Sequence, residues 1–592
     1  MRACRILFPA IASAAALLLA AAGVAQASPP HAPGPELNTA VDLMPRPCAF
    51  EGNDKFERQF YEIEGWEAPN YERYPGDCQR LRFSFGPILV KPGQNDVLAE
   101  PVRIEKPMRD GYITRIEPNL VDPNGEVPPT EQVHLHHGTW LSEPSYGSGP
   151  FFAAGEEKTI APFPRGYGMP VKATDLWFLL YMVHSAVQEP MSLYITYDVD
   201  FVPQADAEEL GLKPAYPQWL DVRPSGYPVF NTQRDFGKRG KCTWPKEECA
   251  SFDPWGEKIV GQGEPGNGVG EDFELPAAGK SLGAIESFNG GTLIGIGGHV
   301  HPGGIQNEID LVRNGKSRRI YTGRAAYWKR KNHDKPGGPP TSWDFSMRVS
   351  GNPYWGVRVE PGDVLRSNAT YDTKIQSTYE NMGIAVTLLA PDTPEGEPTA
   401  PGVDPFKAPV DKSKACKSGG LEAKRPKLCP QGLAYTHGHL PENDNYGAAE
   451  GAWEAQTGSP ASEVAIANFL YQPGDFSTIE MSGVPTVKLG ETLNFNNLEG
   501  TTIYHTITSC AFPCKGPTGV AFPLSDGETS SGGRVDFDSG ELGIGAPVIG
   551  PAKQTLRWGL PVTAEDGFKS GDVVTYFCRI HPGMRGAFEV TQ

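Results

Sequence analysis

The chain ends in a short motif in which three metal-binding side chains follow a strand-like run. Residues 573–577 read Val-Val-Thr-Tyr-Phe, and after them come Cys578, His581 and Met584 at intervals of three. A thiolate, an imidazole and a thioether on one tight loop can all turn toward a single soft metal ion. Such a site needs a second imidazole from a distant strand, and an alternating stretch upstream offers His505. The sequence therefore predicts a β domain built around a metal ion held by these four side chains.

A single cysteine in an exported chain is more often half of a disulfide, so the cysteine count bears on this interpretation. The chain has 10 Cys, and Cys4 lies in an N-terminal segment that reads as a targeting sequence. Nine then remain, and if Cys578 binds metal, the other eight can pair. Sequence alone leaves the connectivity open, but the expected pairs are Cys242–Cys249, Cys416–Cys429, Cys510–Cys514 and Cys48–Cys78.

Glycine and proline favour an all-β architecture. The 592 residues include 69 Gly and 57 Pro, and few stretches show a helical apolar stripe. This composition suits many short strands joined by turns, and the length allows several domains with their own cores. The net charge of -18 disfavours binding to nucleic acid or to an anionic membrane surface.

The N-terminus predicts export. Residues 1–27 carry two arginines, an apolar Ala/Leu core and a small-residue ending, which is the pattern of a cleavable secretory signal. No later segment is apolar over a length that could span a bilayer. We therefore expect a secreted or periplasmic protein in a compartment where disulfides persist.

Composition and strand patterns divide the chain into five parts. After the signal come two blocks that read as antiparallel β-sandwiches, a Pro-, Gly- and acid-rich linker that includes a Cys416/Cys429 loop, and the C-terminal β domain. The expected boundaries are 1–27, 39–203, 204–391, 392–460 and 461–592.

Histidines gather at several places in the two sandwich blocks. His299 and His301 lie at i and i+2 of a strand-like segment, so both side chains leave one face and can share an ion, although they could also be an ordinary pair of turn histidines. In the first block, strand alternation places His134 and His136 on one face. The adjacent His136 and His137 point to opposite faces unless a β-bulge intervenes.

Parts of this chain resemble three families. The set His505, Cys578, His581 and Met584 resembles the type 1 copper ligands of the cupredoxins, such as plastocyanin and azurin, which implies a Greek-key β-sandwich over about 461–592. The order of the upstream histidines resembles that of the copper type II ascorbate-dependent monooxygenases, the peptidylglycine α-hydroxylating and dopamine β-monooxygenase family. The Gly-His-x-His-x-Gly-Gly phrase is also similar to secreted proteins of the stress-up-regulated nodulin type.

The monooxygenase resemblance implies two jelly-roll sandwiches, each holding one copper ion. By this resemblance the electron-transfer copper is held by His136, His137 and His184. The oxygen-activating copper, where the catalytic chemistry takes place, is held by His299, His301 and Met382. The resemblance overrides the preference from strand geometry and makes His134 a residue outside the ligand set.

These observations lead to three hypotheses. The first is an exported multi-copper redox protein, whose blue-copper domain takes electrons from an external one-electron donor and passes them to a two-copper module that oxidises a small molecule or peptide with O2. The second is a copper-binding electron-transfer or copper-handling protein without oxygenase chemistry. The third is an adhesive β protein with incidental histidines. His437 and His439 fit either a further copper site or a solvated loop.

Overall fold

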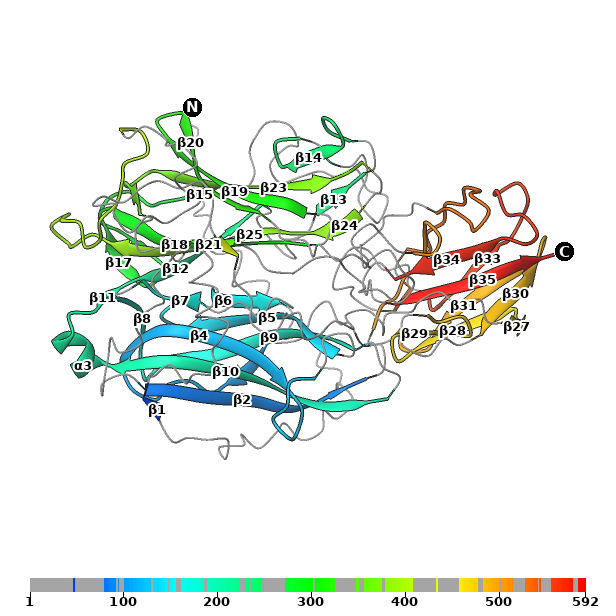
Figure 1. The fold of residues 1–592 in the computed structure, drawn as a ribbon, viewed down its shortest axis with the longest axis horizontal. Helices are drawn as coiled ribbons and strands as arrows, with labels where there is room; N and C mark the ends of the chain where they lie inside the picture. The colour runs from blue at the N-terminus through cyan, green and yellow to red at the C-terminus, as the bar shows by residue number, and fades with distance from the viewer. Residues whose placement is uncertain are drawn as a thin grey trace, which may run out of the picture.

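The computed structural model shows an all-β chain with three sandwiches, as the sequence predicts (Figure 1). Among the described residues the only helix is α3 (Gln204–Glu209), and none has the length and apolar character needed to cross a membrane. The structure describes residues 46–47, 79–91, 94, 101–128, 133–146, 149–155, 161–164, 166–185, 189–222, 230–233, 236–247, 249, 272–301, 304–324, 348–350, 356–374, 378–407, 433–434, 457–476, 483–500, 503–514, 527–540, 542–544, 555–578 and 584–592.

The first sandwich has two sheets that enclose an aromatic-rich core. One sheet has the order β1 (Arg46–Pro47), β2 (Gln79–Val90), β10 (Met191–Pro203), β4 (Gly111–Val121), β8 (Tyr167–Val171) and β11 (Lys213–Pro214), with β7 (Ala161–Pro162) beside β4. The other has the order β3 (Val102–Ile104), β9 (Leu176–Ser185), β5 (Val133–Glu143) and β6 (Pro150–Gly155). Trp140, Trp177 and Tyr197 are completely buried between them.

The second sandwich has a similar construction. One sheet has the order β12 (Tyr216–Asp221), β25 (Gly383–Pro391), β18 (Gly291–Val300), β21 (Arg348–Ser350) and β26 (Leu433–Ala434), with β22 (Val357–Val359) beside β18. The other has the order β14 (Lys241–Trp244), β23 (Val364–Asp372), β19 (Gly304–Arg313) and β20 (Lys316–Arg324), with β15 (Asp272–Glu274) beside β23. Two small pairs are β13 (Phe230–Thr232) with β24 (Thr378–Asn381), and β16 (Lys280–Leu282) with β17 (Ile285–Phe288).

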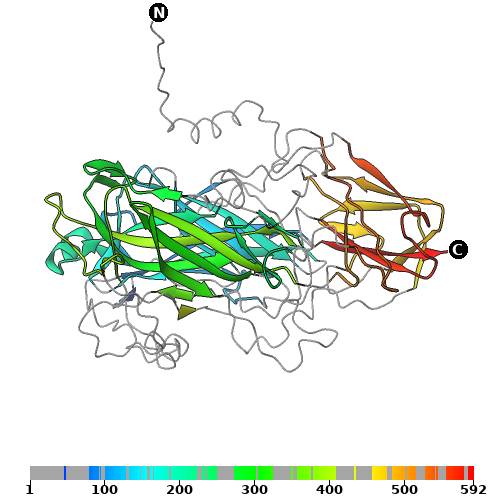
Figure 2. The same cartoon turned by 90° about the horizontal axis from the view of Figure 1, so that it is seen from above.

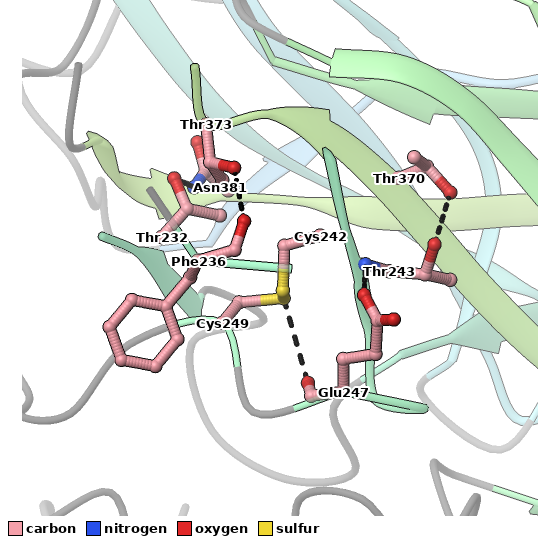
Figure 3. The surroundings of a disulfide bond; sticks show 9 residues. All are labelled: Thr232, Phe236, Cys242, Thr243, Glu247, Cys249, Thr370, Thr373 and Asn381. Carbon is pink, nitrogen blue, oxygen red and sulfur yellow. Dashed lines mark hydrogen bonds between the residues drawn. A yellow bond between two sulfur atoms is a disulfide. The ribbon is translucent and has the colours of Figure 1, made fainter. Parts of the chain in front are cut away.

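A disulfide fixes the irregular entry to the second sandwich. Cys242 on β14 is bonded to Cys249, which confirms that predicted pair (Figure 3). The Thr243 hydroxyl lies 2.8 Å from that of Thr370 on β23, and the Thr243 backbone N–H donates to the Glu247 carboxylate. These contacts hold the short loop against the sheet.

The third sandwich mixes parallel and antiparallel strands. Its sheets have the orders β27 (Thr457–Pro460), β30 (Val484–Lys488), β35 (Arg585–Thr591), β34 (Val573–Phe577), β32 (Thr508–Cys510), and β29 (Leu470–Gln472), β28 (Glu463–Ala467), β31 (Thr492–Asn497), β33 (Arg557–Pro561). The pairs β27/β30, β30/β35 and β28/β31 are parallel. The predicted disulfide between Cys510 and Cys514 is confirmed.

The predicted boundaries fall beside strand ends, with three differences. β11, which lies past the expected end of the first block, pairs with β8 of the first sandwich. β10 ends at Pro203 and β25 at Pro391, where the first and second blocks were expected to end. β27 begins at Thr457, a few residues before the expected start of the last domain. β26 pairs with β21, so part of the expected linker returns to the second sandwich. The expected signal segment and the Cys48–Cys78 and Cys416–Cys429 pairs lie outside the described residues.

The first two sandwiches pack against each other along a seam, and the third lies at one end of the pair (Figures 1 and 2). Ile294 and Ala390 of the second sandwich belong to the hydrophobic core cluster of the first. The rings of Tyr146 and Tyr216 meet across the same seam in a tilted arrangement, with their centroids 6.4 Å apart. The seam is therefore a packed interface rather than a loose linkage.

Candidate metal centres

A β-bulge in β5 brings two adjacent histidines together. Leu135 is the register partner of Val183 on β9, whereas His137 is the partner of Met182, so His136 is an extra residue in β5. The extra residue breaks the strict alternation of side chains. As a result, the rings of His136 and His137 lie side by side, with centroids 4.6 Å apart. From the sequence, His136 and His137 were expected to share a face only if a β-bulge lay between them, and the structure has this bulge.

The His-x-His pair of the second sandwich keeps the arrangement that strand alternation predicts. His299 is the register partner of Ile384 on β25, and His301 directly follows the end of β18. Their ring centroids are 5.2 Å apart, with the rings nearly perpendicular. Both imidazoles therefore face the same region at the seam.

Three of these imidazoles converge from two sandwiches. His137, His299 and His301 each offer a ring nitrogen, and the three nitrogens lie within 4.8 Å of one another. We call these residues the imidazole cluster. The shortest separation is 3.1 Å, between Nε2 of His137 and Nε2 of His301. Two nitrogens bound to one ion at ~2.1 Å lie roughly 3.3–3.6 Å apart, so a small shift would allow both rings to bind the same ion. At 3.1 Å the same rings can also hydrogen-bond to each other.

The grouping differs from the one that the monooxygenase resemblance implies. His137 lies with His299 and His301, whereas the resemblance assigns it to a separate ion with His136 and His184. The His136 ring is farther away, 6.3 Å from that of His301 between centroids. The backbone of His184 pairs with His134, and the side chains of both lie outside the described residues.

Met382 is connected to the imidazole cluster through a tyrosine. Its buried side chain packs with Ile384 and Trp219. The Tyr371 hydroxyl donates to the Met382 carbonyl at 2.8 Å, and it accepts the backbone N–H groups of Met382 and His301 at 3.1 and 2.7 Å. Tyr371 was not identified from the sequence, because nothing in its neighbourhood marks it as part of a metal site. Its hydroxyl fixes the backbone of His301 relative to Met382.

The third sandwich brings together three of the four predicted type 1 ligands. Cys578 and Met584 flank the loop between β34 and β35, and the Cys578 N–H donates to the Met584 carbonyl at 3.1 Å. The sulfur of Cys578 lies 3.9 Å from Nδ1 of His505 and accepts the Thr506 N–H at 3.2 Å. His505, Cys578 and Met584 are all completely buried, and we call them the cysteine centre. His581 lies outside the described residues.

The sulfur–nitrogen distance in the cysteine centre matches the spacing of two ligands on one ion. Bonds of ~2.3 Å to sulfur and ~2.1 Å to nitrogen, opened by the roughly 120° of a trigonal site, place the two atoms about 3.8 Å apart. The observed distance is 3.9 Å. Burial opposes a charge on His505, but Cys578 and Glu499 outweigh it and raise the pKa of the imidazole. The neighbouring Cys578 and Glu499 thus stabilise the positive form of this imidazole.

Glu499 lies behind His505 and was not identified from the sequence. Its carboxylate oxygen Oε2 is 3.9 Å from Nε2 of His505 and accepts the Asn468 N–H at 2.9 Å. Oε1 is 3.3 Å from the Lys91 ammonium of the first sandwich. Burial would raise the pKa of Glu499, but the neighbouring His505 and Lys91 lower it to about 2. A carboxylate behind a ligand histidine orients the ring and increases its basicity.

His437 and His439, for which the sequence suggested either a further copper site or a solvated loop, lie outside the described residues. Their role stays a prediction.

Comparisons with known proteins give only distant likenesses. No protein-family model and no curated protein matches the chain. Among solved structures, the major capsid protein P2 of bacteriophage PM2 is 10% identical, with a TM-score of 0.23 over 53% of this chain and 98% of that one. The capsid of the virus PBCV-1 is 9% identical, with a TM-score of 0.14 over 52% and 84%. Procruciferin, an 11S globulin of Brassica napus, is 8% identical, with a TM-score of 0.12 over 63% and 93%. At these TM-scores the likenesses carry no inference about this chain.

Proposed function

We propose that this chain is an exported copper redox protein. The cysteine centre exchanges single electrons with an external donor, and the imidazole cluster receives them and oxidises a substrate with O2. The observation that carries the proposal is the buried sulfur of Cys578, held 3.9 Å from Nδ1 of His505 in the same core cluster as Met584. Export rests on the signal-like pattern of residues 1–27.

The donor chemistry of the cysteine centre favours copper over zinc. Structural zinc takes thiolates, imidazoles and carboxylates, whereas a thioether is a soft ligand that favours Cu(I). Met584 adds such a thioether to the same buried core cluster as Cys578. A bound copper ion would supply reversible one-electron chemistry. The Thr506 N–H, which donates to the sulfur, and Glu499, which lies behind His505, would hold the two ligands in place.

The imidazole cluster has the composition of a reactive site. Three protein ligands leave a coordination position for water or substrate, which is typical of catalytic rather than structural sites. Imidazoles suit copper, zinc, iron and nickel alike, so the argument for copper here is the electron supply from the cysteine centre. His137, His299 and His301 would bind the ion, and Tyr371 would hold His301 in register with Met382.

An alternative is a copper-binding electron-transfer or copper-handling protein without oxygenase activity. The observation in its favour is the 3.1 Å separation between His137 and His301, which also fits rings that hydrogen-bond to each other or hold an ion in storage. In that case the cysteine centre would still be blue and redox-active, but the imidazole cluster would not react with O2.

Metal content and spectra of the purified full chain test the proposal. We expect one intense blue absorption band, and at least one further copper ion whose spin-resonance spectrum differs from that of the blue site. Cys578→Ser should remove the band and leave the second copper, whereas His299→Ala should do the reverse, so that each variant is the control for the other. Colourless oxidised protein, or a blue band that survives Cys578→Ser, would refute the cysteine centre.

Oxygen chemistry is tested separately. With ascorbate as reductant, the wild type should consume O2 or release peroxide, and His299→Ala should not. Equal uptake by both proteins would reject the imidazole cluster as the reactive site. Blue protein that carries copper at both centres but shows no uptake with any substrate would favour the alternative.

A further inference from the structure

One buried residue of the first sandwich packs against the hydrophobic core of the third. Met182 lies on β9 and is only 5% exposed, yet it belongs to the hydrophobic cluster formed by the third sandwich. Its neighbours Val183 and Leu179 belong instead to the core of the first sandwich. Because alternate residues of a strand face opposite sides, Met182 points out of its own sandwich and into the neighbouring one.

The same methionine is adjacent to a ligand of the imidazole cluster. Met182 is the direct register partner of His137 across the β5–β9 ladder. Side chains of directly opposed residues leave the same face, with Cβ atoms roughly 5 Å apart. The hydrophobic cluster to which Met182 belongs also contains Cys578 and Met584. A single side chain therefore joins the surroundings of the two candidate metal centres.

Polar contacts also join the first sandwich to the third. Lys91 of the first sandwich lies 3.3 Å from Glu499 and 6.0 Å from the centroid of the Phe469 ring. The Phe469 ring lies 5.8 Å from the His505 ring, and Glu499 lies 3.9 Å from Nε2 of His505. Glu499 and Phe469 of the third sandwich thus contact both Lys91 of the first sandwich and the ligand His505.

We propose that Met182 is the bridging residue of an internal electron-transfer junction between the cysteine centre and the imidazole cluster. This inference rests on the proposed function. One electron leaves the reduced cysteine centre, which is oxidised, and reaches the oxidised imidazole cluster through Met182 and its strand partner His137. No bond forms or breaks. The third sandwich accordingly passes its electron to a centre within the same chain. No complex between separate molecules has to form or dissociate.

The test measures the transfer itself in the copper-loaded full chain without O2. A one-electron reductant generated by a light flash bleaches the blue band, and the recovery of the band reports the passage of the electron to the second centre. In the wild type, recovery should be first-order and independent of protein concentration. Met182→Ala should slow it by roughly tenfold or more, because truncation of a buried methionine leaves a cavity that neighbours fill only in part.

Two further variants separate bridging from general loosening. Met182→Leu keeps the buried volume and should restore most of the wild-type rate. Met169→Ala truncates another buried methionine, which lies in the core of the first sandwich, and should leave the rate unchanged. An unchanged rate in Met182→Ala, or equal slowing by Met169→Ala, would overturn the bridging role. A wild type without a blue band or without a second copper would instead remove the proposed function, and this inference with it.

Discussion

The carboxylate of Glu499 offers a test of the junction that does not depend on copper. It lies between the ligand His505 and Lys91 of the first sandwich. These neighbours lower its pKa from an ordinary value of 4.5 to about 2, against the effect of burial. Glu499→Gln removes the charge but keeps the size and an oxygen that can accept the Asn468 N–H. The substitution therefore isolates the electrostatic contribution.

The expected effect follows from the linkage between pKa and stability. A carboxyl whose pKa falls from 4.5 to about 2 on folding contributes at most about 3 kcal/mol to the free energy of unfolding. The Lys91 side chain is 45% exposed, so solvent screens part of this, and we expect about 1–2 kcal/mol. Because the folded pKa is the lower one, the contribution is complete above pH ~4.5 and is lost as the pH falls toward ~2.

Calorimetry of the metal-free full chain measures this contribution. At pH 6, Glu499→Gln should lower the melting temperature of the third sandwich by roughly 3–6 °C. The difference should stay constant down to about pH 4.5 and shrink as the pH falls further. The exposed Glu491 provides the matched control, since Glu491→Gln should have little effect at any pH. A difference that stays constant from pH 6 to pH 3, or no difference at all, would show that Glu499 is not held between His505 and Lys91.

Three further predictions concern the metal centres. Tyr371→Phe removes the acceptor of two buried N–H groups and should lower the free energy of unfolding in urea by about 1–3 kcal/mol; an unchanged midpoint would contradict the contacts with His301 and Met382. In the Cys578→Ser variant, which lacks the thiolate of the cysteine centre, zinc is a redox-inert probe of the imidazole cluster and should stabilise the protein by about 2.7 kcal/mol at one hundred times its dissociation constant; adding His137→Ala should abolish this gain. Met584→Leu should keep the blue band but raise the reduction potential in voltammetry, because a hydrocarbon cannot donate to Cu(II); a lowered potential would exclude Met584 as a ligand.

The parts of the fold that depend on local sequence were predictable. Frequent glycine and proline, with strand alternation between them, indicate short strands, and the described chain is all β apart from α3. Cys242 and Cys249, and likewise Cys510 and Cys514, are so close in sequence that few alternatives compete, and both pairs are present. Each of these predictions depends on residues within a few positions of one another.

Strand geometry also made part of the candidate site predictable. His299 and His301 face one side because they are two positions apart on a strand. His136 and His137 lie side by side because of a β-bulge. The sequence showed that a bulge would be necessary for this, but not that one is present. Tyr371, Glu499 and Met182 could not be found in this way, since their contacts join residues or sandwiches that are distant along the chain.

The membership of the imidazole cluster follows from packing rather than from any local pattern. His137 belongs to the first sandwich and His299 and His301 to the second, so their separation is set by how the two sandwiches meet. Ile294 and Ala390 belong to the core of the first sandwich, which fixes that contact before any ion binds. An ion shared by the three imidazoles would therefore join two sandwiches that already touch, and its binding free energy would add to the stability of the seam. Ligand order along the sequence carries no information about this contact, so it could suggest which histidines bind metal but not which of them share an ion.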